Sequence, residues 1–400
     1  MRKTINIGDL GTIITGKTPP TTNKNYYGDY AVFIKPTDIS EQSKYTYETE
    51  EMYSKLAAEK YESSLIPKGA ICVPCIGTIG TKMTMTPCDC YTNQSINSII
   101  CNENYDNEYV YYLIKNFLPG LKAYNLGTAS GREYVSKSNF EKIELVAEQD
   151  QEIQKKIGII LSRYDSLIEN YQKQIKLLEE AAQRLYKEWF VDLHFPGHEN
   201  TKIVDGVPEG WEKKKVGEIG TVITGKTPST SNKENYGGSI PFITIPDMHT
   251  GIYPVSSVFL SEKGAESQSK KYIPQGALIV SCIGTAGLVC ITKERCQTNQ
   301  QINSLILDDK EMLHYMYFVF LSLKEHLNNI GSNGATMTNV NKSKFEGIDI
   351  VVPSSCIIRD FSQRTTPYFE NIKSLQSQLR LLTEARDRLL PKLMSGEITI

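Results

Sequence analysis

The stretch GDLGTIITGKTPPTTNKNYYG at residues 8–28 recurs as GEIGTVITGKTPSTSNKENYG at residues 217–237. Further along, VSKSNFEKIEL (135–145) recurs as VNKSKFEGIDI (340–350), so the offset between the copies falls only from 209 (217 minus 8) to 205 (340 minus 135). A repeat of about half the chain is far longer than a solenoid unit of roughly 20–50 residues. The repeat therefore predicts two homologous domains, which suit a molecule that reads two similar things at a fixed separation.

Two more pairs of segments lie between these ends. PKGAICVPCIGTIG (67–80) matches PQGALIVSCIGTAG (274–287), and YTNQSINSII (91–100) matches QTNQQINSLI (297–306). Within each copy, β-branched runs such as Gly11–Thr15, Ala31–Ile34 and Ala70–Val73 predict strands, whereas Tyr109–Leu118 and Met312–Leu327 predict helices. The fold class expected is therefore mixed α and β.

The composition is that of an ordinary globular protein, with 400 residues, 40% hydrophobic and 22% charged. No stretch approaches the roughly 18 unbroken apolar residues of a membrane span, and the N-terminus lacks the apolar centre of a signal peptide. We therefore expect a cytoplasmic location. The net charge of −2 argues mildly against a nucleic-acid binder, although phosphate contact needs only a local basic surface. It suggests that tight binding depends on partners.

A long helical segment follows each copy of the repeat. In the first, about Asp150 to Phe190, apolar residues recur in steps of four and three at Ile153, Ile157, Ile160, Tyr164, Leu167, Tyr171, Ile175, Leu178, Ala182, Leu185 and Trp189. That spacing is a heptad seam with one stutter near Tyr171. The second segment, about Ile357 to Leu393, has a similar seam at Phe361, Tyr368, Ile372, Leu375, Leu379, Leu382 and Leu389.

Two prolines interrupt the second segment. Pro367 predicts a short helix, a break and a longer helix that begins near the proline, since proline is tolerated in a first turn. Pro391 predicts an end or a kink. Sustained heptads favour a helix partner, so we expect the two segments to pair as an antiparallel coiled coil with pseudo-twofold symmetry. The alternative is that each helix folds back on its own domain.

A nucleotide-binding motif appears in both copies but in an unsuitable context. Gly11 to Thr18 and Gly220 to Thr227 fit G-x-x-x-x-G-K-[ST]. A P-loop needs a strand before the motif and a helix directly after its lysine. Here the loop residues are Thr-Ile-Ile or Thr-Val-Ile, which favour a strand, and Thr-Pro-Pro or Thr-Pro-Ser follows. The motif is better interpreted as a strand that ends in an exposed Gly-Lys turn, with Lys17 and Lys226 available to a DNA phosphate.

Metal binding and catalysis also find little support. Cys72, Cys75, Cys88 and Cys90 have zinc-like spacing, but Cys72 corresponds to Ile279 and Cys88 has no counterpart in the second copy. The odd count of nine cysteines also argues against a disulfide framework. Buried thiols are the favoured interpretation, and no metal site is expected. None of the five histidines recurs between the copies, so we expect no catalytic residues.

Polar, turn-rich loops are the chemistry that does recur. Asn, Gln, Arg and Lys side chains read base edges, while Ser, Thr, Lys and backbone N–H groups hold phosphates. For any single residue, a solvated loop remains the alternative. The candidates for DNA contact are Lys17, Thr18, Asn25, Tyr26, Tyr27, Thr78, Asn93, Gln94, Ser130, Arg132 and Lys137 in the first copy and Lys226, Thr227, Asn235, Tyr236, Thr285, Asn299, Gln300, Asn333, Thr336, Lys342 and Lys344 in the second.

These residues, taken in order, resemble the DNA-specificity subunit of Type I restriction-modification systems. The resemblance covers essentially the whole chain. Its carriers are Thr-Gly-Lys-Thr-Pro in both copies, Val-Pro-Glu-Gly-Trp (207–211), Ile-Pro-Lys-Gly (66–69) with Ile-Pro-Gln-Gly (273–276), Ile-Gly-Thr (76–78 and 283–285), Gly-Ala-Thr-Met (334–337) and Leu-Leu-Pro-Lys-Leu-Met-Ser-Gly-Glu (389–397). One departure is Gly-Thr-Ala-Ser-Gly-Arg-Glu at 127–133, where the second copy reads Gly-Ser-Asn-Gly-Ala-Thr-Met at 331–337.

The resemblance implies a non-catalytic subunit with two target-recognition domains, each reading one half of a split site on double-stranded DNA. It implies target-recognition domain 1 at 1–148, a central helix at 149–190, a linker at 191–210, target-recognition domain 2 at 211–354 and a distal helix at 355–396. The helices are implied to set the gap between half-sites and to dock two modification subunits. The helix residues assigned to partner binding are Ile157, Tyr164, Leu178, Leu185, Ile372, Leu379 and Leu389.

The cofactors implied belong to the partners. The modification subunits would methylate adenine N6 with S-adenosylmethionine, and two motor-nuclease restriction subunits would use ATP and Mg²⁺. The chain itself is expected to hold no cofactor. The rival interpretation from another class is a P-loop ATPase or a self-sufficient restriction enzyme. A third is a coiled-coil adaptor without DNA recognition.

Overall fold

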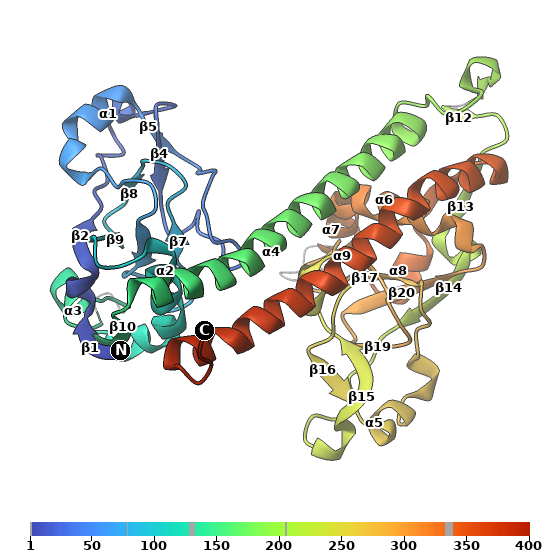
Figure 1. Cartoon of the computed structure of the whole chain (residues 1–400). Helices are drawn as coiled ribbons and strands as arrows, with labels where there is room; N and C mark the ends of the chain where they lie inside the picture. Colours follow the sequence, from blue (N-terminus) through green and yellow to red (C-terminus); the bar gives the residue numbers. More distant parts are fainter. Residues whose placement is uncertain (1, 78, 128–132, 205, 333–338) are drawn as a thin grey trace. The chain divides into compact units, whose positions relative to one another are not determined.

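The computed structural model describes residues 2–77, 79–127, 133–204, 206–332 and 339–400. The chain divides into two compact units. Unit 1 is Met1–Asn170 with Arg380–Ile400, and unit 2 is Tyr171–Leu379. Each unit holds one copy of the repeat together with parts of two long helices (Figure 1). The predicted mixed α and β class is confirmed.

Unit 1 contains two four-stranded sheets and a separate strand pair. The first sheet has the order β2-β9-β6-β7, the second the order β3-β5-β4-β8, and β1 pairs with β10. The strands are β1 (Arg2–Asn6), β2 (Gly11–Thr15), β3 (Tyr27–Gly28), β4 (Ala31–Ile34), β5 (Met52–Tyr53), β6 (Ile71–Pro74), β7 (Thr84–Met85), β8 (Tyr91–Thr92), β9 (Ile96–Cys101) and β10 (Glu144–Glu148). The strands predicted at 11–15, 31–34 and 70–73 are confirmed to within one residue.

Unit 2 repeats this topology. Its sheets have the orders β14-β20-β17-β18 and β16-β15-β19, and β13 pairs with β21. The strands are β13 (Glu212–Lys215), β14 (Gly220–Thr224), β15 (Tyr236–Ile243), β16 (Val258–Leu260), β17 (Leu278–Ser281), β18 (Val289–Ile291), β19 (Gln297–Thr298), β20 (Ile302–Leu307) and β21 (Asp349–Val352). In the linker, β11 (Ile203–Val204) pairs antiparallel with β12 (Val207–Pro208).

Short helices pack on these sheets. Unit 1 has α1 (Lys55–Lys60), α2 (Asn107–Phe117) and α3 (Lys137–Glu141), and unit 2 has α5 (Glu262–Glu266), α6 (Leu313–Ser322), α7 (Lys324–Ser332) and α8 (Lys342–Glu346). The helix predicted over 312–327 is therefore divided at Leu323. The Oγ of Ser322 donates to the carbonyl of Val319 at 2.7 Å, which offers the backbone an alternative to a continuous ladder.

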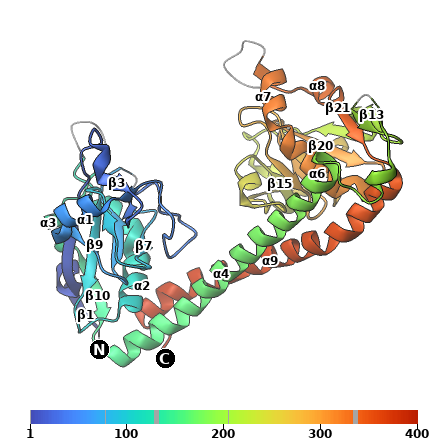
Figure 2. The same ribbon diagram turned by 90° about the horizontal axis from the view of Figure 1, so that it is seen from above.

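The two heptad segments form α4 (Gln151–Tyr186) and α9 (Ser355–Ser395). In unit 1 the beginning of α4 and the end of α9 share one core, with Ile157 and Leu161 on α4 and Leu390 and Leu393 on α9 (Figures 1 and 2). In unit 2 the opposite ends meet. There Ala182 of α4 lies in the same core as α9 residues such as Ile372. An early part of one helix meets a late part of the other in each unit, which is antiparallel packing.

Both alternatives for the helices hold in part, since each core also contains strand and α2 or α6 residues of its own repeat. This explains one error in the predicted seam. The heptad spacing predicts Leu167 in the seam, but this side chain is 44% exposed, whereas Leu161 and Ile168 are 0% and 3% exposed. The first part of α4 packs on its own domain as well as on α9, so its buried face is wider than a two-helix seam.

The predicted break at Pro367 is wrong, and so is the prediction that the helix ends at Pro391, because α9 runs through both prolines. Pro367 lies on the exposed side of the helix, where the carbonyl that loses its N–H partner can be solvated. Two threonines just before it donate to carbonyls one turn back: Thr365 Oγ1 to Phe361 at 2.8 Å and Thr366 Oγ1 to Ser362 at 2.7 Å. Burial of the adjacent apolar face then holds the helix continuous.

Candidate nucleic-acid interface

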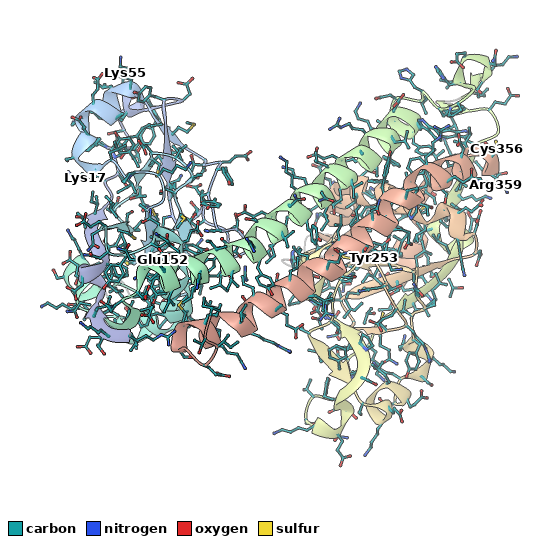
Figure 3. All side chains as sticks on the ribbon, viewed as in Figure 1. Lys17, Lys55, Glu152, Tyr253, Cys356 and Arg359 are labelled. Carbon is teal, nitrogen blue, oxygen red and sulfur yellow. The ribbon has the colours of Figure 1, made fainter. Side chains whose placement is uncertain are left out.

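The Gly-Lys-Thr turn after β2 is held by its backbone. Gly16 N–H donates to the carbonyl of Ile96 at 3.2 Å, and Lys17 N–H donates to that of Thr92 at 2.9 Å. The Lys17 side chain is exposed, and Figure 3 labels it at the margin of unit 1. Within the described stretch 2–77, the first helical turn after it is η2 (Lys24–Tyr26), a 3-10 turn. The motif therefore forms a strand and an exposed turn, as interpreted from the sequence, and lacks the helix that a P-loop requires.

Unit 2 builds the same turn with the same bonds. Gly225 N–H donates to the carbonyl of Ile302 at 3.0 Å, and Lys226 N–H donates to that of Thr298 at 2.9 Å. Lys226 is also exposed. The two copies of the motif thus share geometry as well as sequence.

Close backbone approach explains the glycine of the motif. A Cβ on Gly16 would lie 2.1 Å from the carbonyl oxygen of Thr92, and one on Gly225 would lie 2.1 Å from that of Asn299. Any other residue would collide with a neighbouring strand end. The glycine is therefore required by packing, and its presence needs no bound nucleotide.

A second loop lies beside each turn. The Thr18 hydroxyl donates to Oε1 of Gln94, and the Thr227 hydroxyl donates to Oε1 of Gln300. Gln94 and Gln300 are exposed, and because this bond uses the amide oxygen, the amide N–H₂ of each side chain remains as a donor. Each unit thus gathers a lysine, a threonine and a glutamine from two predicted segments into one cluster, which we call the Lys-Thr-Gln cluster.

Two of the candidate tyrosines bond to the turn that carries this cluster. Tyr27 donates its hydroxyl to the carbonyl of Pro19 at 2.9 Å, and Tyr236 does the same to Pro228 at 2.8 Å. Burial raises the pKa of both phenols. These side chains pin the proline that follows Lys-Thr, so their first role is to shape the turn.

The neighbouring candidates differ between the units. Asn25 is exposed, and the Tyr26 hydroxyl accepts from Lys60 Nζ at 2.6 Å. In unit 2 Asn235 takes the place of Tyr26 (26 plus 209). It is only 7% exposed and donates to the carbonyl of Ser229 at 3.0 Å. Asn235 therefore supports its loop from within.

The asparagines next to the glutamines shape the second loop. Asn93 Oδ1 accepts from Ser95 N–H at 3.0 Å, and Asn299 Oδ1 accepts from Gln301 N–H at 3.1 Å. Asn299 is 8% exposed. Side chains that accept from the backbone two residues on stabilise tight turns.

The remaining candidates lie on other elements. Lys137 and Lys342 are exposed near the starts of α3 and α8, where they pair with Glu141 at 3.5 Å and Glu346 at 3.4 Å. Lys344 Nζ donates to the carbonyl of Ile330 at 2.8 Å. Thr285 is exposed in the loop between β17 and β18. Five candidates lie outside the described residues: Thr78, Ser130, Arg132, Asn333 and Thr336.

One Thr–Asn hydrogen bond that recurs in both copies is not among the residues predicted from the sequence. Thr15 Oγ1 donates to Oδ1 of buried Asn97 at 2.7 Å, and Thr224 Oγ1 donates to that of buried Asn303 at 2.6 Å. These bonds fix the strand ends that carry the Lys-Thr-Gln clusters. The signal was present in the duplicated Ile-Asn-Ser of 96–98 and 302–304.

The cysteines behave as buried packing residues. Cys72 Sγ lies 3.2 Å from Ser98 Oγ, and Cys75 Sγ donates to the carbonyl of Val73 at 3.4 Å. Burial raises the pKa of both thiols to about 12. Of the nine cysteines, Cys88 and Cys356 are exposed. In the part of the chain that the structure describes, no group of three or more His, Cys, Asp or Glu side chains could hold a metal ion.

The helix residues assigned to partner binding face the units' own cores. Ile157 is 1% exposed and Ile372 is 0% exposed. Leu178, Leu185, Leu379 and Leu389 pack against the same cores, and Tyr164 is partly buried. The apolar side chains that α4 and α9 leave open are Ile159, Leu167, Leu177 and Leu381, at 49%, 44%, 53% and 56% exposure.

None of the helices formed by the described residues is long and apolar enough to cross a membrane.

The chain matches known proteins over nearly its whole length. A family model described as Type I restriction modification DNA specificity domain matches residues 2–180 and 208–363. The HindI specificity subunit of Haemophilus influenzae is 36% identical over 314 residues, 62% of this chain and 68% of that protein. The MjaIX specificity subunit of Methanocaldococcus jannaschii is 28% identical, and the match covers 98% of this chain and 93% of that protein.

A solved structure shares the fold. The Type I restriction-modification S subunit from M. genitalium superposes with a TM-score of 0.62 at 16% identity, covering 98% of this chain and 96% of that one. Two matched specificity domains, each carrying one copy of the same Lys-Thr-Gln cluster, account for the internal repeat. The chain therefore belongs to the family of Type I restriction-modification DNA-specificity subunits.

Proposed function

We propose that each unit reads one half of a bipartite DNA target through the surface centred on its Lys-Thr-Gln cluster. One observation carries this proposal. Two diverged domains keep the same exposed lysine and glutamine on the same backbone scaffold, while residues around them, such as Tyr26 and Asn235, differ. A shared lysine and glutamine with different neighbouring residues suit two domains that recognise related but different DNA sequences.

Within the cluster the side chains divide by chemistry. Lys17 and Lys226 are exposed cations on short turns, suited to backbone phosphates, which position a protein without specifying sequence. Gln94 and Gln300 present amide N–H donors, and glutamine pairs with base edges in the major groove. We assign the lysines to phosphate contact and the glutamines to base contact.

Mapping of modified adenines in a host that carries the complex tests the bipartite target. We expect two short specified half-sites separated by an unspecified gap, related but not identical when read on opposite strands. A single continuous target would contradict the proposal.

As a specificity subunit, the chain recognises DNA and leaves catalysis to its partners. We propose that α4 and α9 dock two modification subunits, which methylate adenine N6 with S-adenosylmethionine, and that two restriction subunits add cleavage with ATP and Mg²⁺. The open side chains Ile159, Leu167, Leu177 and Leu381 support this assignment, because exposed apolar groups on otherwise polar helices favour a protein partner. Because the proposed substrate is DNA inside the host cell, we propose a cytoplasmic location.

The rival function, an ATPase or a self-sufficient restriction enzyme, makes a separate prediction. The isolated chain would bind ATP through Lys17 or Lys226. We expect no saturable nucleotide binding, because the motif lies on a strand and its glycine is packed against a neighbouring strand end. ATP binding that is lost in Lys17→Ala would revive the rival.

A further inference from the structure

Unit 1 contains a buried ion pair between the two long helices. Arg386 Nη1 of α9 donates to Oδ1 of Asp165 on α4 at 2.6 Å, and the two residues are 8% and 4% exposed. Tyr112 of α2 donates its hydroxyl to the other oxygen of Asp165 at 2.6 Å. Arg386 also pairs with its neighbour Asp387 at 2.7 Å. Both buried charges are thus partnered, which they must be because an unpaired buried charge is strongly unfavourable.

The repeat shows what occupies the same place in unit 2. The helices align at an offset of 204, since Tyr368 minus Tyr164 and Leu389 minus Leu185 both give that value. Asp165 then corresponds to Phe369, and Arg386 corresponds to Ala182. The short helices align at 206 (Tyr315 minus Tyr109), so Tyr112 corresponds to Phe318 (318 minus 112).

Contacts in unit 2 confirm these equivalences in apolar form. The rings of Phe318 and Phe369 lie with centroids 6.0 Å apart, where unit 1 has the Tyr112–Asp165 hydrogen bond. Phe369 and Ala182 are 1% and 0% exposed and belong to one core. One junction between the helices is therefore ionic, and the equivalent junction combines a large ring with a small methyl group.

Because the two junctions differ, the residues at the two junction positions are not the same on α4 as on α9. The α4 helix carries Asp165 and Ala182, and α9 carries Phe369 and Arg386. Antiparallel pairing of α4 with α9 places aspartate opposite arginine and alanine opposite phenylalanine. Pairing of α4 with a second α4 would place Asp165 opposite Ala182, leaving a buried carboxylate without a cation and an unfilled volume. Pairing of α9 with a second α9 would crowd Phe369 against an arginine that has lost Asp165 and keeps only its neighbour Asp387.

We infer that these four positions select α9 as the partner of α4 and exclude pairing of either helix with its counterpart in a second copy of the chain. The repeat gives such a device a function. Homologous helices with similar apolar faces can otherwise pair with themselves, and a buried polar residue is an established way to specify helix partners. A chain that paired with a second copy would present two identical recognition units in place of two different ones.

The test transfers the apolar junction into unit 1 of the full-length chain. The triple variant Tyr112→Phe, Asp165→Phe and Arg386→Ala copies the residues of unit 2, so every pairing of the helices becomes compatible. Two copies with different affinity tags are co-expressed and purified through one tag. We expect the second tag to co-purify several-fold more than with the unchanged chain, at the mass of two chains by light scattering. Co-purification no greater than for the unchanged chain overturns the inference.

A matched control separates charge from partner choice. The exchange Asp165→Arg with Arg386→Asp keeps the pair complementary between α4 and α9 but still opposes a charge to Ala182 or Phe369 in the excluded pairings. Its co-purification should stay at the level of the unchanged chain, and an increase like that of the triple variant would contradict the inference. If the triple variant does not fold, the double variant Asp165→Leu with Arg386→Met removes the same charges and carries the same expectation.

Discussion

Lys17 and Lys226 illustrate how a residue's surroundings decide its chemistry. Letter for letter, both belong to a nucleotide-binding motif, yet each follows a strand and lies on a turn closed by backbone bonds to the next loop. The β-branched residues before the lysines made the strand predictable from sequence. The bond from Thr18 to Gln94 was not predictable, because it joins segments 76 residues apart.

Removal of either lysine should weaken DNA binding without changing its sequence preference. For Lys17→Ala or Lys226→Ala in the reconstituted complex, we expect lower affinity for all sequences and a salt dependence, log K against log [salt], shallower by about one charge. Titrations at several salt concentrations measure both. Lys202→Ala, an exposed lysine of the linker, is the matched control and should change neither. An unaltered slope in both test variants would remove the lysines from the phosphate contacts.

His314 should make stability depend on pH. It is buried on α6, its Nδ1 lies 2.9 Å from Thr365 Oγ1, and its ring stacks on Phe369 with centroids 4.0 Å apart. Burial lowers its pKa to about 4. Between pH 6.5 and 4 the unfolded chain binds a proton that the folded chain does not, so stability falls with falling pH through this window, by about 3 kcal/mol in total.

Urea unfolding between pH 4 and 7 measures this dependence. His314→Phe keeps a ring against Phe369 and removes the titrating group, and Thr365 retains its bond to the Phe361 carbonyl. The variant should lose stability less steeply than the unchanged chain as pH falls. Parallel curves for the two proteins would show that His314 does not contribute.

At the scale of elements, α9 shows where sequence patterns stop being sufficient. Its heptad residues correctly predicted a long helix, but proline chemistry predicted a break at Pro367 that the structure does not contain. The heptad pattern alone does not show whether the loss of one backbone hydrogen bond outweighs the burial of Phe361, Phe369 and Ile372 on the opposite face. Burial favours continuity, because each of these side chains contributes roughly 1.5–3 kcal/mol.

Pro367→Ala should therefore stabilise the protein. Alanine restores an N–H that can donate to the carbonyl of Gln363 and has a higher helix propensity, so we expect a gain of about 1–3 kcal/mol. The midpoint of urea unfolding measures it. Gln363→Ala, an exposed change one turn earlier on the same helix, controls for the introduction of alanine alone. A lower midpoint for Pro367→Ala would indicate that the proline fits a distortion that the helix needs.

At the scale of the whole molecule, the repeat predicted two homologous domains and the structure contains two units of matching topology. The division of each long helix between the two units was harder to predict from the sequence. The resemblance predicts helices that are separate from the domains, whereas packing assigns α4 to one unit up to Asn170 and α9 to the other unit up to Leu379. Sequence periodicity identifies an apolar face but does not say which core it enters. That assignment depends on contacts between residues more than 200 positions apart, such as Asp165 with Arg386.

If the helices set the gap between half-sites, lengthening one should change the target. We expect four residues, about one helical turn, inserted into α4 near Tyr171 to alter the number of base pairs in the gap and leave the half-sites unchanged. Mapping of modified adenines measures it. The same insertion in the linker near Glu199, outside α4, should leave the gap as it was. An unchanged gap in the α4 variant would refute the ruler.

The distribution of thiols has a practical consequence. Burial raises the pKa of Cys72, Cys75, Cys282 and Cys290 to about 12, so these side chains resist maleimide chemistry at neutral pH. The exposed pair, Cys88 and Cys356, falls one in each unit, and Figure 3 labels Cys356. The natural chain is thus ready for a donor and an acceptor dye without engineered cysteines. Energy transfer between dyes on Cys88 and Cys356 would report the distance between the two units, with and without DNA.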